Sequence, residues 1–220
     1  VLLLNSDAWL VGEALERLAA AGERRSRAAV VAPRLLDPDG TLQRSVRGFP
    51  TLWRLATEYL FLRKLAPGSS LLNDFYGASF PHDEERAVEW VMGACLLVRR
   101  EAIADVGPFD EEFFLFSEET DWCYRAHRAG WEIVFTPAAE CVHVGGASHG
   151  GRLYRENLRG HLRFFAKHRG LREAERARRL LHASLVLRGR LFRGERGAGY
   201  RDAAAWLASG RVPELLERER

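Results

Sequence analysis

The sequence lacks any apolar run of the roughly 18 residues that a transmembrane helix needs, and no secretory signal peptide is visible in it. Cysteine is scarce: Cys95, Cys123 and Cys141 show no CxxC spacing and each stands in an apolar setting. We therefore expect buried free thiols in a reducing compartment. These absences predict a cytoplasmic protein, with peripheral contact at the inner face of the cell membrane as a further option.

The composition indicates an ordered chain with an uneven distribution of charge. Of 220 residues, 47% are apolar and 29% are charged, which suits one large domain or a domain with an appendage. The net charge is only +3, but residues 151–220 hold 18 basic and 8 acidic residues, against 15 and 22 in residues 1–150. We therefore expect an acidic catalytic or metal-binding body over 1–150 and a basic helical tail over 151–220.

The hydrophobic pattern predicts an α/β fold. The run 1–4 is typical of a buried parallel strand, residues 10–21 have helical spacing that ends near Gly22, and 28–32 form a second strand. Further strands are expected at 87–91, 94–98 and 131–135, the last ended by Pro137, with a short piece at 140–143. Helices are expected at 99–106 and 121–129, and the chain appears helical and basic from Gly151 onward.

Polar residues follow the first predicted strand. In open α/β sheets, ligands bind beyond the carboxyl ends of strands, where Asn5 and Asp7 are expected to lie. An amide oxygen beside a carboxylate suits a hard divalent cation that holds a diphosphate. The pair is equally typical of a turn that caps the following helix.

Three carboxylates stand close together after an aromatic run. Glu118, Glu119 and Asp121 follow the segment 113–116, FFLF. Like-charge repulsion and an apolar wall both raise carboxyl pKa values, which can prepare a general base. The cluster also fits the acidic first turn of a helix, favoured by the helix dipole. Both can hold, with Asp121 structural and Glu119 chemical.

His143 lies between two valines. A single histidine near an apolar strand is most often structural. If it converges with Asp7, imidazole and carboxylate together would suit Mn²⁺ or a similar ion.

Taken in order, these stretches resemble a known family, the inverting family 2 glycosyltransferases of the rhamnosyl- and galactofuranosyltransferase-like branch. The resemblance covers about residues 1–168. It is carried by LLNSD at 3–7, VAPRLLDPDGT at 31–41, WVMGACLLVRR at 90–100, VGPFDEEFF at 106–114, SEETDWC at 117–123, AGW at 129–131 and VH at 142–143. It implies a GT-A fold, incomplete here: a mixed sheet with flanking helices, followed by the basic helical tail.

The resemblance also implies roles for single residues. Asp7 corresponds to the last acid of the metal-binding DxD-type motif, with Asn5 in place of its first acid, and His143 to the distal metal ligand. Glu119 falls at the catalytic base, where most relatives have aspartate, and Glu118 is the acid that precedes it.

An acceptor-binding set follows from the same resemblance. Gly93 and Ala94 match the segment that borders the acceptor site, and Trp90, Asp121 and Trp122 are placed with them. The implied partners are a nucleoside-diphosphate sugar donor and a polyprenyl-diphosphate-linked or glycan acceptor, with Mn²⁺ or Mg²⁺ as cofactor. The reaction would be a single displacement with inversion, since no covalent sugar–enzyme intermediate is required.

The chain departs from the family at its start. Complete members carry a nucleotide-binding segment before the Asn-x-Asp strand, so we expect upstream sequence to be missing and the isolated chain to have little transferase activity. The strand 1–4 would then form an unprotected sheet edge. The competing hypothesis is a non-catalytic remnant that acts as a membrane-surface or glycan-binding module.

The first helix of the tail has a basic and an apolar stripe. The basic side chains recur every three or four residues, at Arg152, Arg155, Arg159, Arg163 and Lys167. The apolar stripe holds Tyr154, Leu158, Leu162 and Phe165. Two interpretations stay open: a helix near the membrane surface beside a lipid-linked acceptor, or a core-packing helix with a solvated basic face. Nucleic-acid binding is not expected, because no recognition motif accompanies the charge.

Overall fold

The computed structural model describes residues 1–66, 69–73, 75, 80–145 and 151–217. The chain forms two compact units, each built from several segments. Unit 1 comprises Val1–Phe49, Tyr76–Asp110 and Glu119–Gly146, and unit 2 comprises Pro50–Phe75, Glu111–Glu118 and Ala147–Arg220. The units therefore do not correspond to a single cut near residue 150. Each is described by itself.

Unit 1 is built on a mixed sheet of order β1-β8-β3-β9-β2, with β4 paired to β3 and β6 to β9. The strands are β1 (Leu2–Leu4), β2 (Ala8–Leu10), β3 (Ala28–Leu36), β4 (Leu42–Gln43), β6 (Arg86–Val88), β8 (Cys95–Val98) and β9 (Glu132–His143). Only β3 and β9 pair in parallel among these described strands; the other pairs are antiparallel. A second small sheet joins β5 (Val46–Arg47) to β7 (Trp90–Val91).

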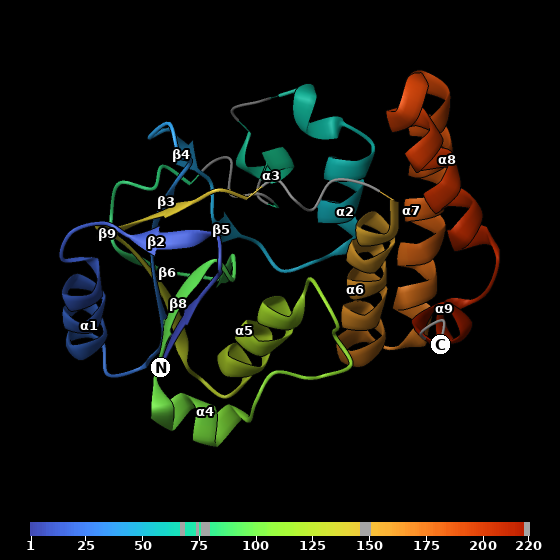
Figure 1. The fold of residues 1–220 in the computed structure, drawn as a ribbon. Helices are drawn as coiled ribbons and strands as arrows, with labels where there is room; N and C mark the ends of the chain where they lie inside the picture. The colour runs from blue at the N-terminus through green and yellow to red at the C-terminus, as the bar shows by residue number, and fades with distance from the viewer. Residues whose placement is uncertain (67–68, 74, 76–79, 146–150, 218–220) are drawn as a thin grey trace. The chain divides into compact units, whose positions relative to one another are not determined.

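Helices cover both faces of the sheet, because the central strands are apolar on both sides. Val31 of β3 and Val134 of β9 face the core beneath α1 (Ala14–Arg24). Their neighbours Val30 and Ile133 face the opposite core, which residues of α4 (Arg100–Val106) and α5 (Glu118–Arg128) complete. Figure 1 shows α1 and α5 on opposite sides of the sheet. This alternation is the period of two that strands impose. The predicted α/β sheet with flanking helices is thus confirmed.

Three predicted boundaries are wrong, two at the ends of the first helix and one at the end of a strand. The first helix begins at Ala14 instead of Leu10, since Ala8–Leu10 pairs with β9. Gly22 lies inside that helix. β9 runs through Pro137, because the β3–β9 ladder jumps there from Thr136 to Glu140. A proline in this bulge has no ladder hydrogen bond to lose.

The first strand differs from its predicted environment. β1 pairs antiparallel with β8 and lies at one end of the described strand order. Val1 is 56% and Leu4 42% exposed, where a buried parallel strand was expected. The edge itself agrees with the expectation of an unprotected strand.

Unit 2 is helical. It contains α2 (Leu52–Tyr59), a 3₁₀ turn (Leu62–Lys64), α3 (Ser70–Asn73), α6 (Gly151–Arg169), α7 (Leu171–Leu191), α8 (Gly194–Ala208) and α9 (Val212–Leu216). The predicted helical tail is therefore confirmed. Its core is apolar and fully buried, and includes Leu55, Leu158, Leu162, Phe165, Leu181 and Leu185. No helix of the described chain is long and apolar enough to span a bilayer.

The basic stripe of α6 is engaged within unit 2. Arg155 forms an ion pair with Asp202, and Lys167 lies over the Phe113 ring. Arg159 is 9% exposed and donates to the Leu215 carbonyl at 2.9 Å, while Arg163 donates to the Leu216 carbonyl at 2.6 Å. The side chain of Arg152 lies outside the described residues. These contacts favour the interpretation in which α6 packs into the core of unit 2. The basic face of the helix differs from the expectation, because its side chains contact other parts of unit 2 in place of solvent.

The side chain of Arg188, on α7, caps the carboxyl end of helix α2. Its guanidinium donates to the carbonyls of Glu58 and Tyr59, at 2.7 and 2.9 Å. Carbonyls in the last turn of a helix have no partner within that helix, so a buried arginine here replaces water. The same group lies 4.3 Å from the Phe61 ring centroid and 5.5 Å from that of Tyr200. Arg188 therefore links α2, the following turn and α8.

His161 should make unit 2 sensitive to acid. It is fully enclosed beside Tyr59 and Phe75, and burial lowers its pKa to about 4. An unfolded histidine has a pKa near 6.5. Between these values the unfolded state binds more protons, so this stability is complete above pH 6.5 and is lost as pH falls toward 4. When the pH falls from 7.5 to 4.5, the unfolding free energy of the wild type should therefore decrease by about 2–3 kcal/mol more than that of His161→Phe.

Urea unfolding at the two pH values measures this difference. His182→Phe is the matched control, because His182 lies half-buried on α7. Equal pH dependence of wild type and His161→Phe would contradict the assignment.

Candidate functional site

A pairing between β2 and β9 brings the two predicted metal ligands together. Ala8 lies opposite His143 in this ladder, so Asp7 stands beside the end of β9. The distance from His143 Nε2 to Asp7 Oδ1 is 3.5 Å. Asn5 completes the group, with its Nδ2 3.3 Å from the same Nε2. The three polar residues predicted from two distant stretches of sequence therefore meet at one place.

Two residues that the sequence did not reveal hold His143. Its Nδ1 lies 2.7 Å from Gln43 Oε1, and Gln43 Nε2 donates to Asp37 at 2.7 Å. With Nδ1–H donating to Gln43, the lone pair of Nε2 points toward Asp7 and Asn5. In the sequence, Asp37 stands out only as part of the stretch 31–41, and Gln43 lies outside every stretch that was singled out. No local signal identifies them, because their role arises from the β3–β4 pairing.

The donor set fits a hard divalent cation. Asp7 retains 40% side-chain exposure beside the nearly buried His143, so the carboxylate is open to a ligand. Mn²⁺ or a similar ion accepts a carboxylate together with an imidazole whose ring is fixed by an amide, whereas Mg²⁺ would rely on the carboxylate and other oxygen atoms. Within the described part of the chain, no group of three or more His, Cys, Asp or Glu residues is placed to hold a metal. A bound cation would therefore need further oxygen ligands, as Mg²⁺ commonly takes from substrate phosphates and water.

A short segment connects this pair to the predicted base. The backbone N–H of Asn5 donates to the backbone carbonyl of Ala94 at 3.0 Å. A Cβ built on the neighbouring Gly93 would lie 3.7 Å from the carboxyl group of Glu119. Gly93 and Ala94 thus stand between the Asn5–Asp7 loop and α5. The segment expected to border an acceptor site is where the two groups of polar residues approach each other.

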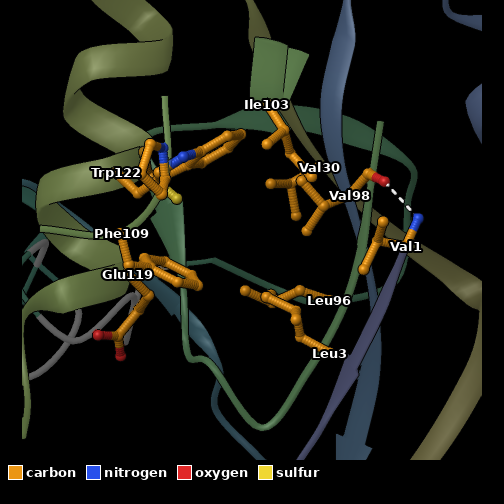
Figure 2. A pocket seen from close by; sticks show the side chains of 11 residues that line it. Val1, Leu3, Val30, Leu96, Val98, Ile103, Phe109, Glu119 and Trp122 are labelled. Carbon is orange, nitrogen blue, oxygen red and sulfur yellow. Dashed lines mark hydrogen bonds between the residues drawn. The ribbon is translucent and has the colours of Figure 1, made fainter. Parts of the chain in front are cut away.

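Glu119 lies at the mouth of an apolar cavity of about 200 Å³. Leu3, Leu96, Phe109 and Trp122 form much of its wall, and Figure 2 shows the Glu119 carboxylate pointing away from the leucines. The aromatic and aliphatic wall lies along the methylene groups of the Glu119 side chain, while its carboxylate points out of the apolar cavity. Burial and the Glu119 carboxylate together raise the pKa of the neighbouring Cys123 thiol.

The start of α5 has unusual backbone geometry. Phe116 and Ser117 have φ of 66° and 70°, in a region that side chains other than glycine rarely adopt. Directly after them, burial raises the pKa of Glu118, and its buried Oε2 has no hydrogen-bond partner among the described residues. The strained backbone at Phe116 and Ser117 therefore fixes where the helix begins, and with it the positions of the Glu118 and Glu119 side chains.

Three residues expected in the acceptor-binding set have internal hydrogen-bond or ion-pair partners. Asp121 is fully buried and forms an ion pair with Arg125 at 2.8 Å. Trp122 is 4% exposed and donates to the Gly107 carbonyl. Trp90 is half-buried, and its indole N–H is bonded to Gly48. Asp121 and Trp122 therefore stabilise α5 from the core, because each polar atom already has an internal partner.

Comparison with known proteins identifies the family. A model described as glycosyltransferase like family 2 matches residues 3–161. The chain belongs to this family. The glycosyltransferase-family match ends within α6, so it includes every residue of the candidate site.

Among the curated relatives of this glycosyltransferase-family chain, two are named as rhamnosyltransferases and one as a hexosyltransferase. An N-acetylglucosaminyl-diphospho-decaprenol L-rhamnosyltransferase of Mycobacterium tuberculosis is 35% identical over 143 residues, covering 65% of this chain and 46% of the relative. Rhamnosyltransferase WbbL of Escherichia coli K12 is 27% identical over 132 residues, covering 57% and 45%. The low-salt glycan biosynthesis hexosyltransferase Agl10 of Haloferax volcanii is 23% identical over 154 residues, covering 65% and 41%. The chain spans less than half the length of these relatives.

Proposed function

We propose that this chain carries the metal and acceptor side of an inverting glycosyltransferase. The observation that carries the proposal is the convergence of Asp7 and His143 at 3.5 Å, with Ala94 bonded to the adjacent Asn5 loop and Gly93 against Glu119. A hydroxyl group near Gly93 would lie within reach of a carboxylate. A diphosphate near Asp7 would lie within reach of a cation.

Glu119 is proposed as the general base. It would accept the proton of the acceptor hydroxyl as that oxygen attacks the anomeric carbon. Attack on the face opposite the leaving group gives inversion in one step. Glu118 directly precedes Glu119 in the chain, and burial raises its pKa. It is therefore the second candidate for the general base.

Asp7 and His143 are proposed to hold Mn²⁺ or Mg²⁺, with Asn5 beside them. The cation, when bound, would neutralise charge on the departing nucleoside diphosphate. Gln43 would keep the His143 ring in the tautomer that leaves Nε2 free to coordinate.

The names of the relatives suggest the substrates. We propose a nucleoside-diphosphate sugar as donor, with rhamnose as the first choice and galactofuranose as the second. The proposed acceptor is a polyprenyl-diphosphate-linked N-acetylglucosamine or a related glycan. The test incubates the 220-residue chain, and the longest product of its reading frame, with labelled sugar nucleotide, Mn²⁺ and this acceptor. Labelled lipid product with inverted anomeric configuration by NMR supports the proposal, and its absence from both polypeptides contradicts it.

The competing proposal is a non-catalytic membrane-surface or glycan-binding module. Binding of the acceptor without turnover, in both polypeptides, would support this second function.

Metal binding can be tested without sugar transfer. Asp7→Asn and His143→Gln should each abolish measurable Mn²⁺ binding by the chain, because each removes one of the two side chains proposed to coordinate the cation. Gln43→Ala should weaken binding by about 10–100-fold, since it releases the ring of His143. Titration followed by Mn²⁺ electron paramagnetic resonance measures the affinity.

Asp39→Asn is the matched control for this titration. It removes the same charge from the neighbouring turn, where Asp39 bonds only to Thr41 among the hydrogen bonds of the described residues. Unchanged Mn²⁺ affinity in Asp7→Asn would refute the site.

A further inference from the structure

The exposed face of α7 is strongly basic. Arg172, Arg176, Arg179 and Arg190 are all exposed and recur at helical spacing along one side of the helix. The opposite side is the buried one and includes Ala174, Leu181 and Leu185. At 1.5 Å per residue, the four arginines extend over about 27 Å.

Little negative charge offsets this face. Arg176 pairs with Glu173, and Glu175 bonds to Arg178 and to the amide of Val212. Glu175 also interacts electrostatically with Arg179, without an ion-pair contact. No hydrogen bond or ion pair within the described chain involves Arg172, Arg179 or Arg190. Three cations of one stripe are thus available to an anionic partner.

Exposed leucines accompany the arginines. Leu187 is 41% exposed within the stripe, and Leu191 at the end of the helix is 62% exposed. Leu171 at the start of the helix is 54% exposed. Arginine beside exposed leucine is the pattern of a helix that lies in a membrane interface, where headgroups pair with the cations and leucine enters the acyl boundary. A nucleic acid would pair with the arginines but would leave the leucines in water.

We infer that the α7 face, defined as Arg172, Arg179, Leu187, Arg190 and Leu191, docks on an anionic phospholipid surface. The inference deepens the proposed function, since it gives an enzyme with a lipid-linked acceptor its contact with the bilayer. It also moves that contact from α6, where the sequence suggested it, to α7. The α6 arginines are occupied by Asp202, Leu215 and Leu216.

The test is co-sedimentation of the 220-residue chain with vesicles of phosphatidylcholine alone or with 30% phosphatidylglycerol. We expect binding to the anionic vesicles that weakens at high salt. The triple variant Arg172→Gln, Arg179→Gln, Arg190→Gln should bind on the order of 100-fold more weakly, at about five-fold for each arginine. Leu187→Ser with Leu191→Ser should weaken the binding that remains at high salt.

The matched control removes the same charge from unit 1, as Arg17→Gln, Arg100→Gln, Arg128→Gln, three exposed arginines. It should bind as wild type does. Circular dichroism melts of all variants identify any loss of fold, and the leucine variant retains the arginines if the triple variant unfolds. Equal binding by the α7 and control triples overturns the inference, as does equal binding to neutral vesicles or no binding at all.

Two further outcomes separate the inference from its alternatives. Tighter binding to a single-stranded oligonucleotide than to anionic vesicles, unaffected by the leucine changes, would overturn it in favour of a nucleic acid. Because no sugar nucleotide is present, failure of sugar transfer leaves the vesicle result standing, and failure of vesicle binding leaves the proposed chemistry standing.

Discussion

Glu119→Gln should lower the turnover number about 10²–10⁴-fold, the range that a lost general base typically costs. The amide is nearly isosteric with the carboxylate, so it preserves the contact with Gly93 but cannot accept a proton. Binding of the sugar nucleotide should be unchanged, because Glu119 is proposed to act on the acceptor side. Initial rates of an active polypeptide that contains residues 1–220 measure the turnover number. Titration with the sugar nucleotide measures its binding.

Three companion variants show whether the loss is specific. Glu119→Asp should retain part of the activity, since it keeps a carboxylate that can accept a proton, on a side chain one methylene shorter. Glu118→Gln separates the second candidate base from the first. Glu23→Gln removes an exposed glutamate of α1 and should leave the rate unchanged. A small effect of Glu119→Gln, with a large effect of Glu118→Gln, would transfer the role to Glu118.

Arg188→Met should lower the unfolding free energy by about 3 kcal/mol. The change leaves the last carbonyls of α2 without the hydrogen bonds from Arg188 and removes a cation from among aromatic rings. Methionine fills similar space, so the loss reflects the charge and its hydrogen bonds more than a cavity. Urea denaturation of the chain gives the free energy, and a loss under about 0.5 kcal/mol would contradict this role.

Two neighbouring variants give the comparison. Arg190→Met, two residues along the same helix but exposed, should change stability by less than about 0.5 kcal/mol. Arg188→Lys keeps the charge but cannot donate to two carbonyls in one plane, so it should lie between wild type and Arg188→Met.

The sequence predicted the elements better than their ends. Apolar runs located β1, β3 and β8, and Gly107 ended α4 as expected, because glycine accepts its φ of 86°. Pro137 misled because a proline stops a strand only where its missing N–H would be needed. Whether a bulge removes that need depends on the partner strand, which local sequence does not contain.

For the candidate site, strand-end positions and the family resemblance pointed to Asp7 and His143, but they missed the residues that hold His143. Asp7 and His143 each follow an apolar run, which is visible in the sequence. Gln43 contacts His143 only because two strands far apart in the chain share one sheet. The helix-start interpretation of the acidic cluster predicts a structural role for Asp121, and its burial beside Arg125 agrees with that role.

The bulge in β9 also sets constraints on chain length. Between Thr136 and Glu140 the strand leaves its ladder with β3, and His143 follows three residues later. Since side chains alternate across a sheet, an added or deleted residue between the bulge and His143 would turn the imidazole to the other face, whereas the irregular stretch before Glu140 can absorb such a change. Natural insertions and deletions in this strand are therefore expected to gather before Glu140, with the spacing from there to the histidine held constant.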